Sequence, residues 1–427
     1  MAIAFLFLII ISLLQCPCHV QGTNNINAVI QALTGISLPP VPAPAPSPHP
    51  CLNDSTSQNV LLATKNLRQN ITNDPQNFTS TWEGCDYCSF MGYYCDIVPD
   101  KNTIGLTSID FNHANFSGNL VFDDFIQNLK DVAIFHISSN NFSGPISSSS
   151  ISNLRYLDEL DLSNNNFAGE FPKSLLGAAK LTFLDLRFNQ FSGLIPAELF
   201  DMDIRVLFLN DNDFSGRIPD NLGNTSALYL SLANNNFSGG IPRSIGHAPN
   251  LLEVLFQNNK LNGCLPYEVG FLSNLTLFNV GSNWLTGPIP KSFGCLASVN
   301  ELVLADNEFY GEVPDTLCML PNLTNLDLSG NFFTSVGPIC RKLFFAGMVN
   351  ATMNCISELP DQRSGSDCTA FAPKSKYSCP YESTFSIVPC DASSSSKGII
   401  SSVAAMEVER GGPKRTYAAL KRNSVQY

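Results

Sequence analysis

The sequence predicts an α/β-type solenoid: a right-handed superhelix of stacked repeats, with a long parallel β-sheet on its concave face and cysteine-stapled caps. Three observations predict this fold. The pattern LxLxxNxFSGxIP occurs in ten copies spaced by 23 to 26 residues. Its leucines alternate with polar residues, as in a short strand with one buried face. Cysteines cluster before and after the repeats. One repeat cannot bury its apolar face alone, whereas a stack makes a continuous core.

Each recurrent position within a repeat has a physical reason. In the third copy, Leu160 and Leu162 form the buried side of a strand. Asn165 follows three residues later, and its side chain has both a donor and an acceptor for backbone groups where the strand turns away. Phe167 fills the turn, Gly169 permits a tight bend and Ile-Pro in other copies fixes an extended return path. The position of Phe167 is occupied in the ten copies by Phe116, Phe142, Phe167, Phe191, Phe214, Phe237, Leu261, Leu285, Phe309 and Phe333.

The charge of the chain argues against nucleic acid as its main partner. The 427 residues include 36 acidic and 24 basic side chains, and only 14% of all residues are charged. Residues 51–390 hold 33 acidic and 18 basic side chains, a net charge of −15, whereas the last 37 residues have a net charge of +3. Because phosphate binding needs clustered Lys and Arg, we expect a basic partner instead.

The amino terminus predicts secretion. An apolar run from Ala2 to Leu14 is shorter than the roughly 20 residues that span a bilayer, and small residues follow it. We interpret it as a signal peptide cleaved between Cys18 and Gly22, although no Lys or Arg precedes the run; a membrane anchor is the alternative. The expected organisation is a signal peptide (1–22), a Pro-rich linker (23–50), an N-terminal cysteine cap (51–106), the repeats (107–339), a C-terminal cysteine cap (340–390) and a disordered basic tail (391–427).

Cysteines and glycosylation sequons agree with an extracellular location. Cleavage leaves an even number of cysteines, so Cys85-Asp86-Tyr87-Cys88 favours disulfides over a zinc site. Cys264 and Cys295 lie within the repeats, and a bridge from one of them to a second chain leaves a homodimer open. The expected disulfide cysteines are Cys51, Cys85, Cys88, Cys95, Cys264, Cys295, Cys318, Cys340, Cys355, Cys368, Cys379 and Cys390. The expected N-glycosylation sites are Asn53, Asn70, Asn77, Asn115, Asn141, Asn224, Asn236, Asn274, Asn322 and Asn350.

The candidate binding surface is the concave face. It consists of the residue between the two leucines of each strand, here called the middle position, and the residue before the first leucine, the leading position. These positions alternate with the buried ones. Carboxylates beside aromatic side chains suit a basic peptide, although acidic residues on a strand face are often only solvated. The predicted ligand-binding residues are Asp110, His136, Glu159, Asp161, Phe183, Asp185, Arg187, Phe208, Tyr229, Glu253, Glu301 and Asp327.

Several segments resemble the N-terminal domain of plant leucine-rich repeat extensins and their extensin-less relatives. They include DPQNFTSTWEGCDYCSFMGYYC from Asp74, YLDELDLSNNNFAGEFPKSLL from Tyr156, LNGCLP from Leu261 and NATMNCISELPDQRSGSDCTAF from Asn350. The resemblance covers residues 51–390 and implies a secreted cell-wall protein that binds basic, cysteine-containing peptides of the rapid alkalinization factor type. Those extensins continue into Ser-Pro repeats, which are absent after Cys390.

Two other functions stay open at this point. A protein that inhibits polygalacturonase would use the same face against a pectin-degrading enzyme, and the acidic pectin itself could bind the basic tail. Glycan hydrolysis would need two cooperating carboxylates, such as Asp161 and Asp185. Neighbouring repeats bring such groups together in any solenoid, and no other catalytic motif is present. We therefore expect a binding protein that uses no cofactor or metal.

Overall fold

The computed structural model describes residues 54–120, 122–144, 146, 151, 154–371, 379 and 390. The chain divides into two units after Pro48, and all described residues belong to the second unit. The expected signal peptide, Pro-rich linker and basic tail lie outside the described residues, as do Cys51 and Asn53.

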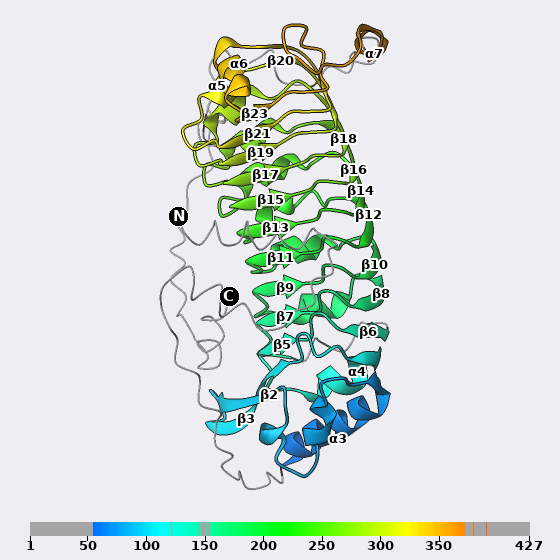
Figure 1. Ribbon diagram of the computed structural model, residues 1–427. Helices are drawn as coiled ribbons and strands as arrows, with labels where there is room; N and C mark the ends of the chain where they lie inside the picture. Colours follow the sequence, from blue (N-terminus) through cyan, green and yellow to red (C-terminus); the bar gives the residue numbers. More distant parts are fainter. Residues whose placement is uncertain are drawn as a thin grey trace, which may run out of the picture. The chain divides into compact units, whose positions relative to one another are not determined.

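The repeats stack and place their leucine-containing strands in one 12-stranded sheet (Figure 1). Strand β2 is antiparallel to β3, and the later strands are parallel. The register is constant, so that Leu207 pairs with Leu184 on one side and with Leu230 on the other. The strands are β2 (Tyr93–Val98), β3 (Thr103–Asp110), β5 (Ile134–His136), β7 (Glu159–Asp161), β9 (Phe183–Asp185), β11 (Val206–Phe208), β13 (Tyr229–Ser231), β15 (Glu253–Leu255), β17 (Leu277–Asn279), β19 (Glu301–Val303), β21 (Asn325–Asp327) and β23 (Val349–Asn350).

A second sheet was not predicted, because we expected only a turn after each Asn. The FSG segments instead form an 11-stranded sheet. Ser hydroxyls reach the preceding repeat there, as where Ser215 donates to the carbonyl of Gly193 at 3.4 Å, and Gly193 itself has a φ of 78°. The strands are β1 (Ile71–Asn73), β4 (Ser117–Asn119), β6 (Asn141–Gly144), β8 (Asn166–Glu170), β10 (Gln190–Gly193), β12 (Asp213–Arg217), β14 (Asn236–Gly239), β16 (Lys260–Cys264), β18 (Trp284–Gly287), β20 (Glu308–Val313) and β22 (Phe332–Val336).

The recurrent Asn of each repeat connects that repeat to the preceding one through backbone hydrogen bonds, as its donor and acceptor predicted. Asn235 is buried, and its Nδ2 donates to the carbonyls of Leu209, Leu232 and Ala233 at 3.0, 3.2 and 3.0 Å. Its Oδ1 accepts the backbone N–H of Phe214 at 2.9 Å. We call this series of side chains the Asn ladder; it fixes each repeat against the one before it.

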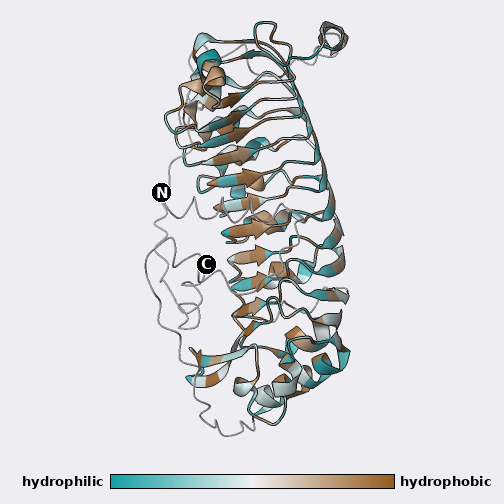
Figure 2. Ribbon diagram, in the orientation of Figure 1, coloured by the Kyte–Doolittle hydropathy of each residue, from teal (hydrophilic) through white to brown (hydrophobic). Residues whose placement is uncertain are grey.

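The core lies between the two sheets and is filled by the leucines and by the predicted aromatic column. Phe167, Phe191, Phe214 and Phe237 are buried, and their neighbouring rings stack at centroid distances of 6.2 to 6.5 Å. Figure 2 shows apolar (brown) segments in most strands of the first sheet, while the connecting segments alternate between brown and teal. Removing the stacked core from water is the main stabilising contribution.

Helices cover the ends of the stack and connect its strands. Helix α3 begins after Asp54, whose Oδ1 accepts the N–H of Ser57 at 2.8 Å, and it ends at Asn70, after which Ile71 starts β1. Within the described residues, no helix is both long and apolar enough to cross a membrane. The helices are α3 (Ser55–Asn70), η1 (Phe78–Thr81), η2 (Tyr87–Ser89), α4 (Phe122–Phe125), η3 (Ile126–Asn128), η4 (Lys173–Gly177), η5 (Ala197–Asp201), η6 (Leu222–Asn224), η7 (Arg243–His247), η8 (Tyr267–Phe271), η9 (Lys291–Cys295), α5 (Asp315–Cys318), α6 (Pro338–Phe345) and α7 (Gly365–Phe371).

Disulfides staple both caps, and three of them connect the C-terminal cap to the repeats. The bonded pairs are Cys88–Cys95, Cys264–Cys379, Cys295–Cys390, Cys318–Cys340 and Cys355–Cys368. Cys85 is also disulfide-bonded. The suggestion that Cys264 or Cys295 bridges two chains is therefore wrong, because each has a partner within the chain.

The Asn ladder gives a direct stability prediction. Asn235→Ala removes one acceptor and the donor shared by three carbonyls, leaving buried backbone groups without partners. We expect a loss on the order of 3 kcal/mol in the free energy of unfolding, measured by urea denaturation. The control is Asn262→Ala, at an exposed position of β16, for which a loss within about 0.5 kcal/mol is expected. Equal losses in both variants would contradict the role of the ladder.

Candidate functional site

The constant register aligns the middle positions of successive repeats in one row across the concave face. Asp110 pairs with His136, His136 with Asp161, Asp161 with Asp185, and Asp185 with Phe208. Neighbouring strands in a sheet lie about 4.8 Å apart. Five of the predicted residues are therefore consecutive neighbours on β3, β5, β7, β9 and β11.

The leading positions form a second row beside the first. Glu159 pairs with Phe183 and Tyr229 with Glu253, while Glu301 pairs with Leu277 and Asn325. The predicted residues thus fall into two sets that are separated by Phe183, Phe208 and Tyr229. We call Asp110, His136, Glu159, Asp161 and Asp185 the first acidic group, and Glu253, Glu301 and Asp327 the second acidic group.

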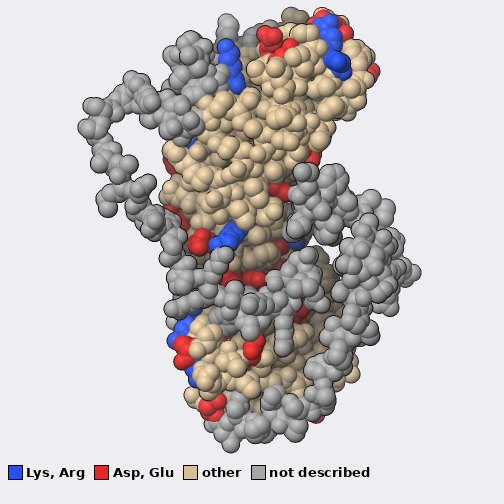
Figure 3. All heavy atoms as spheres, turned by 90° about the vertical axis from the view of Figure 1, so that its left-hand side faces the viewer, with Lys and Arg blue, Asp and Glu red and all other residues tan. Residues whose placement is uncertain are grey.

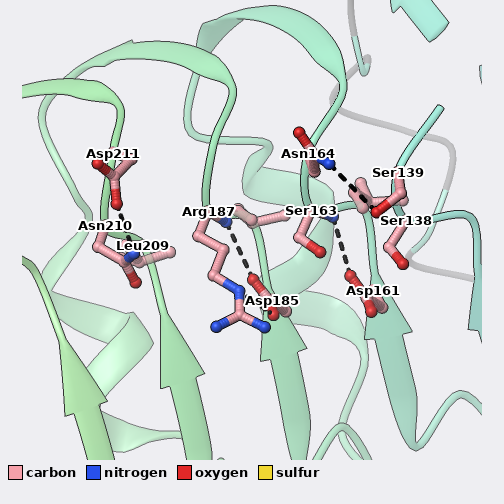
Figure 4. Close-up of polar contacts among 12 residues, drawn as sticks. Ser138, Ser139, Asp161, Ser163, Asn164, Asp185, Arg187, Leu209, Asn210 and Asp211 are labelled. Atoms are coloured by element: carbon pink, nitrogen blue, oxygen red, sulfur yellow. Dashed lines mark hydrogen bonds and ion pairs between the residues drawn. The ribbon is translucent and has the colours of Figure 1, made fainter. Parts of the chain in front are cut away.

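Aspartates at the middle position also serve the backbone. The Oδ1 atom of Asp161 accepts the N–H of Ser163 at 2.9 Å, and that of Asp185 accepts the N–H of Arg187 at 3.1 Å (Figure 4). Asp327 likewise accepts the N–H of Ser329 at 3.0 Å. Such a bond holds the chain where it leaves the strand. The bond uses one of the two carboxylate oxygens, so the half-exposed Asp161 and Asp327 combine a structural task with a surface charge.

His136 is a buried partner of the acids around it, not the exposed ligand residue that we predicted. Only 2% of its surface is exposed, and its Nε2 lies 3.0 Å from Oε2 of Glu159. Burial lowers the pKa of His136. The hydrogen bond to Glu159 and the charges of Asp161, Glu159 and Asp110 outweigh burial, and the pKa lies above its usual value.

Asp185 is fully buried, which also differs from its predicted role as an exposed ligand residue. Its Oδ2 lies 2.9 Å from Nε of Arg187, whose guanidinium lies 5.1 Å from the ring centroid of Phe208. Burial and the charge of Asp161 raise the pKa of Asp185 well above its usual value, although Arg187 opposes this. Asp161 and Asp185 are thus not two accessible carboxylates, and this geometry does not suit the cooperating pair of a glycosidase.

The second acidic group is largely committed to its own neighbours. Glu253 is buried, and both burial and the charge of Glu301 raise its pKa. Glu301 accepts a hydrogen bond from Asn325 at 3.3 Å, and Asp327 accepts the backbone N–H and the hydroxyl of Ser329 at 3.0 and 2.7 Å. Glu159 and Asp161 are also half-exposed, and they differ from the second acidic group in lying on β7, beside the β9 strand that carries Phe183.

Charged side chains are unevenly distributed over the described surface on one side of the molecule. Figure 3 faces the side that lies on the left in Figure 1, and an uncharged area there separates the charges near the α6 end from those over the middle of the stack. Within the described residues, no cluster of three or more His, Cys, Asp or Glu could hold a metal ion. A hollow of about 230 Å³ lies beside Cys264 and Tyr267, away from the two rows.

Two surface residues were missed by the sequence analysis. Tyr94 of β2 is half-exposed, and its pKa is raised by partial burial and by the charge of Asp110, so it adjoins the first acidic group. No repeat pattern could indicate it, because β2 belongs to the cap. Phe188 is 42% exposed and directly precedes Asn189 of the Asn ladder. A comparison of that position between repeats would have found it.

Comparison with known proteins relates these features to a family. The family described as Leucine Rich Repeat matches residues 156–178, 180–202, 203–225, 227–248, 274–296 and 322–343. The chain is 42% identical over 101 residues to leucine-rich repeat extensin-like protein 1 of Arabidopsis thaliana, a match that covers 23% of this chain and 13% of that relative. The chain therefore spans about an eighth of the length of that protein.

Two solved structures share the fold. The first is the leucine-rich repeat ectodomain of the plant membrane receptor kinase GASSHO1/SCHENGEN3 from Arabidopsis thaliana in complex with CASPARIAN STRIP INTEGRITY FACTOR 2. It is 29% identical with a TM-score of 0.62 and covers 70% of this chain and 35% of that one. The second is the ectodomain of the Arabidopsis receptor kinase HAESA in complex with an N-terminally extended IDA peptide hormone. It is 27% identical with a TM-score of 0.58 and covers 66% and 47% of the two chains.

The raised pKa of Asp185 predicts a change of stability with pH. A carboxyl whose folded pKa lies above its unfolded value stabilises the fold while protonated, and this contribution is lost as the pH rises from about 3.8 through the folded pKa. Asp185→Asn keeps an acceptor for the N–H of Arg187 but has no charge to bury. We expect the variant to be more stable than the wild type at pH 8 and to lose this advantage at pH 3.5, by urea denaturation. A variant that is less stable at both pH values would contradict the prediction.

Proposed function

Since this chain is a leucine-rich repeat protein related to the plant leucine-rich repeat extensins, we propose that it binds a basic, cysteine-containing peptide of the rapid alkalinization factor type on its concave face. The binding takes place outside the cell, in the plant cell wall, where it contributes to wall sensing and growth control.

One observation carries this proposal: the half-exposed Glu159 is the direct neighbour of the half-buried Phe183, and the half-exposed Asp161 lies on the same strand as Glu159, with Asp185 between it and the half-buried Phe208. An ammonium or guanidinium group of a peptide can pair with these carboxylates. Its apolar neighbours can bury the rings, and aromatic side chains dominate the energy of many interfaces. The net charge of −15 over residues 51–390 favours the approach of a basic partner.

The remaining members of the site hold its shape. Arg187 is paired with Asp185 and lies against Phe208, so its charge is compensated within the surface. His136 is held between acids in the same way. These residues position the exposed groups, while Glu159 and Asp161 are the ones expected to touch the peptide. The similar HAESA ectodomain was solved with a peptide hormone ligand, which supports a peptide as the class of partner.

The sequons support an extracellular place of action. Each described sequon Asn lies at the surface or partly at it, where a glycan can be attached. The exposed ones are Asn77, Asn115, Asn141, Asn224, Asn274, Asn322 and Asn350, and the half-buried ones are Asn70 and Asn236.

Neutralising the exposed acids tests the proposal. Glu159→Gln and Asp161→Asn keep the size of each side chain, and the amide introduced by the second change retains an oxygen for the N–H of Ser163. We expect each change to weaken the binding of a synthetic rapid alkalinization factor-type peptide about tenfold at low salt, as measured by isothermal titration calorimetry. Asp213→Asn, an exposed acid on β12 of the second sheet, is the matched control and should bind as the wild type does. Unchanged affinity in the first two variants would refute the proposed surface.

The alternative is a protein that binds a pectin-degrading enzyme in defence, as polygalacturonase inhibitors do. It would use the same face, so the acidic variants alone do not distinguish the two functions. Inhibition of a polygalacturonase by the purified protein, without measurable peptide binding, would favour this alternative. Retention on de-esterified pectin would identify the polysaccharide itself as a partner.

A further inference from the structure

One residue on the edge of the concave face differs from its equivalents in nearly every other repeat. The residue before each position of the Asn ladder has a positive φ of 53° or more, the left-handed conformation. The series reads His113, Ser139, Asn164, Phe188, Asp211, Asn234, Asn258, Ser282, Asp306, Gly330 and Met353. Nine of these are small, polar or glycine residues that tolerate this conformation. Phe188 and Met353 are bulky and apolar.

The ring of Phe188 is only partly buried, and its packing contributes little stability against the cost of this backbone conformation. A left-handed backbone is unfavourable for a bulky L-residue, and the φ of Phe188 is 53°. The residue is 42% exposed, so burial of its ring does not offset the free-energy cost of the left-handed backbone. Backbone strain of this kind is typical of binding surfaces, where the surrounding structure imposes it.

The neighbours of Phe188 give its surroundings a negative charge. Its N–H donates to the carbonyl of Asn210 at 3.1 Å, which places Phe188 directly beside Asp211 of the next repeat. Asn210 and Asn234 donate to the two carboxylate oxygens of Asp211 at 2.7 and 2.8 Å and hold that carboxylate in place. In Figure 4, Asp211 and Arg187 extend from neighbouring repeats at this edge, and Arg187 is engaged with Asp185.

We propose that Phe188 and Asp211 form a subsite for one lysine or arginine side chain of the bound peptide. The cation contacts the aromatic ring and pairs with the fixed carboxylate beside it. This inference rests on the proposed function and extends it: the peptide site continues from Glu159 and Asp161 over the ends of the strands to Phe188. A basic side chain complements the charge of Asp211, because the nearby cation Arg187 is paired with Asp185 instead.

The test uses the full chain and a folded synthetic rapid alkalinization factor-type peptide. Phe188→Asn introduces the residue found at the equivalent position of three other repeats. We expect it to weaken peptide binding about tenfold while the thermal unfolding midpoint stays equal or rises, because the strained conformation is relieved. Phe188→Tyr keeps the ring and should bind within about threefold of the wild type.

Met353→Asn is the matched control, because Met353 is also left-handed, apolar and exposed, but lies after β23 at the far end of the concave face. It should raise the unfolding midpoint without changing the affinity. A second series replaces each Arg of the peptide by citrulline and each Lys by norleucine. One of these peptides should bind Phe188→Asn and the wild type equally, because a peptide that lacks the cation can no longer make the contact with Phe188 that the variant removes.

The outcomes separate the two proposals. If the wild type does not bind the peptide, the proposed function fails. If Asp161→Asn weakens binding but Phe188→Asn does not, the subsite alone is refuted. If Phe188→Asn weakens binding yet no neutral replacement in the peptide couples to it, Phe188 contacts an apolar group and the assignment to a basic side chain is wrong.

Discussion

The amide side chain of one Asn per repeat is the constraint on which the rest of the structure depends. Each ladder Asn donates to carbonyls of its own and the preceding repeat, and it accepts an N–H from that preceding repeat. These buried bonds leave a single way to stack successive copies. The sheet register follows from them, and the register in turn decides which side chains become neighbours on the concave face.

Because the register is constant, each residue on the concave face has fixed neighbours in the adjacent repeats. Aspartate at the middle position accepts a backbone N–H, which explains why this residue recurs along the sheet without reference to any ligand. Only where such a carboxylate stays partly exposed beside aromatic rings does the row become a candidate binding surface. That condition is met on β7, where the half-exposed Glu159 and Asp161 lie beside the strand of Phe183, whereas Asp185 and Glu253 are buried.

The repeat pattern was sufficient to predict the stacked sheet, the buried aromatic column and the task of the Asn ladder, because these depend on contacts within and between identical units. It also predicted the order of residues along each row. It could not predict that His136 and Asp185 are buried, because this depends on particular neighbours such as Arg187 and Phe183. The bridge between Cys264 and Cys379 joins residues 115 positions apart, and cysteine spacing alone allows many other pairings.

The central claim is that a basic peptide lies over the first acidic group. Zero-length carbodiimide cross-linking joins a lysine amine to a carboxylate only where the two are in direct contact, and mass spectrometry identifies the joined residues. The account predicts cross-links from the peptide to Glu159 or Asp161 on the concave face. Cross-links found mainly at Asp213 or Glu312, both exposed on the second sheet, would contradict it.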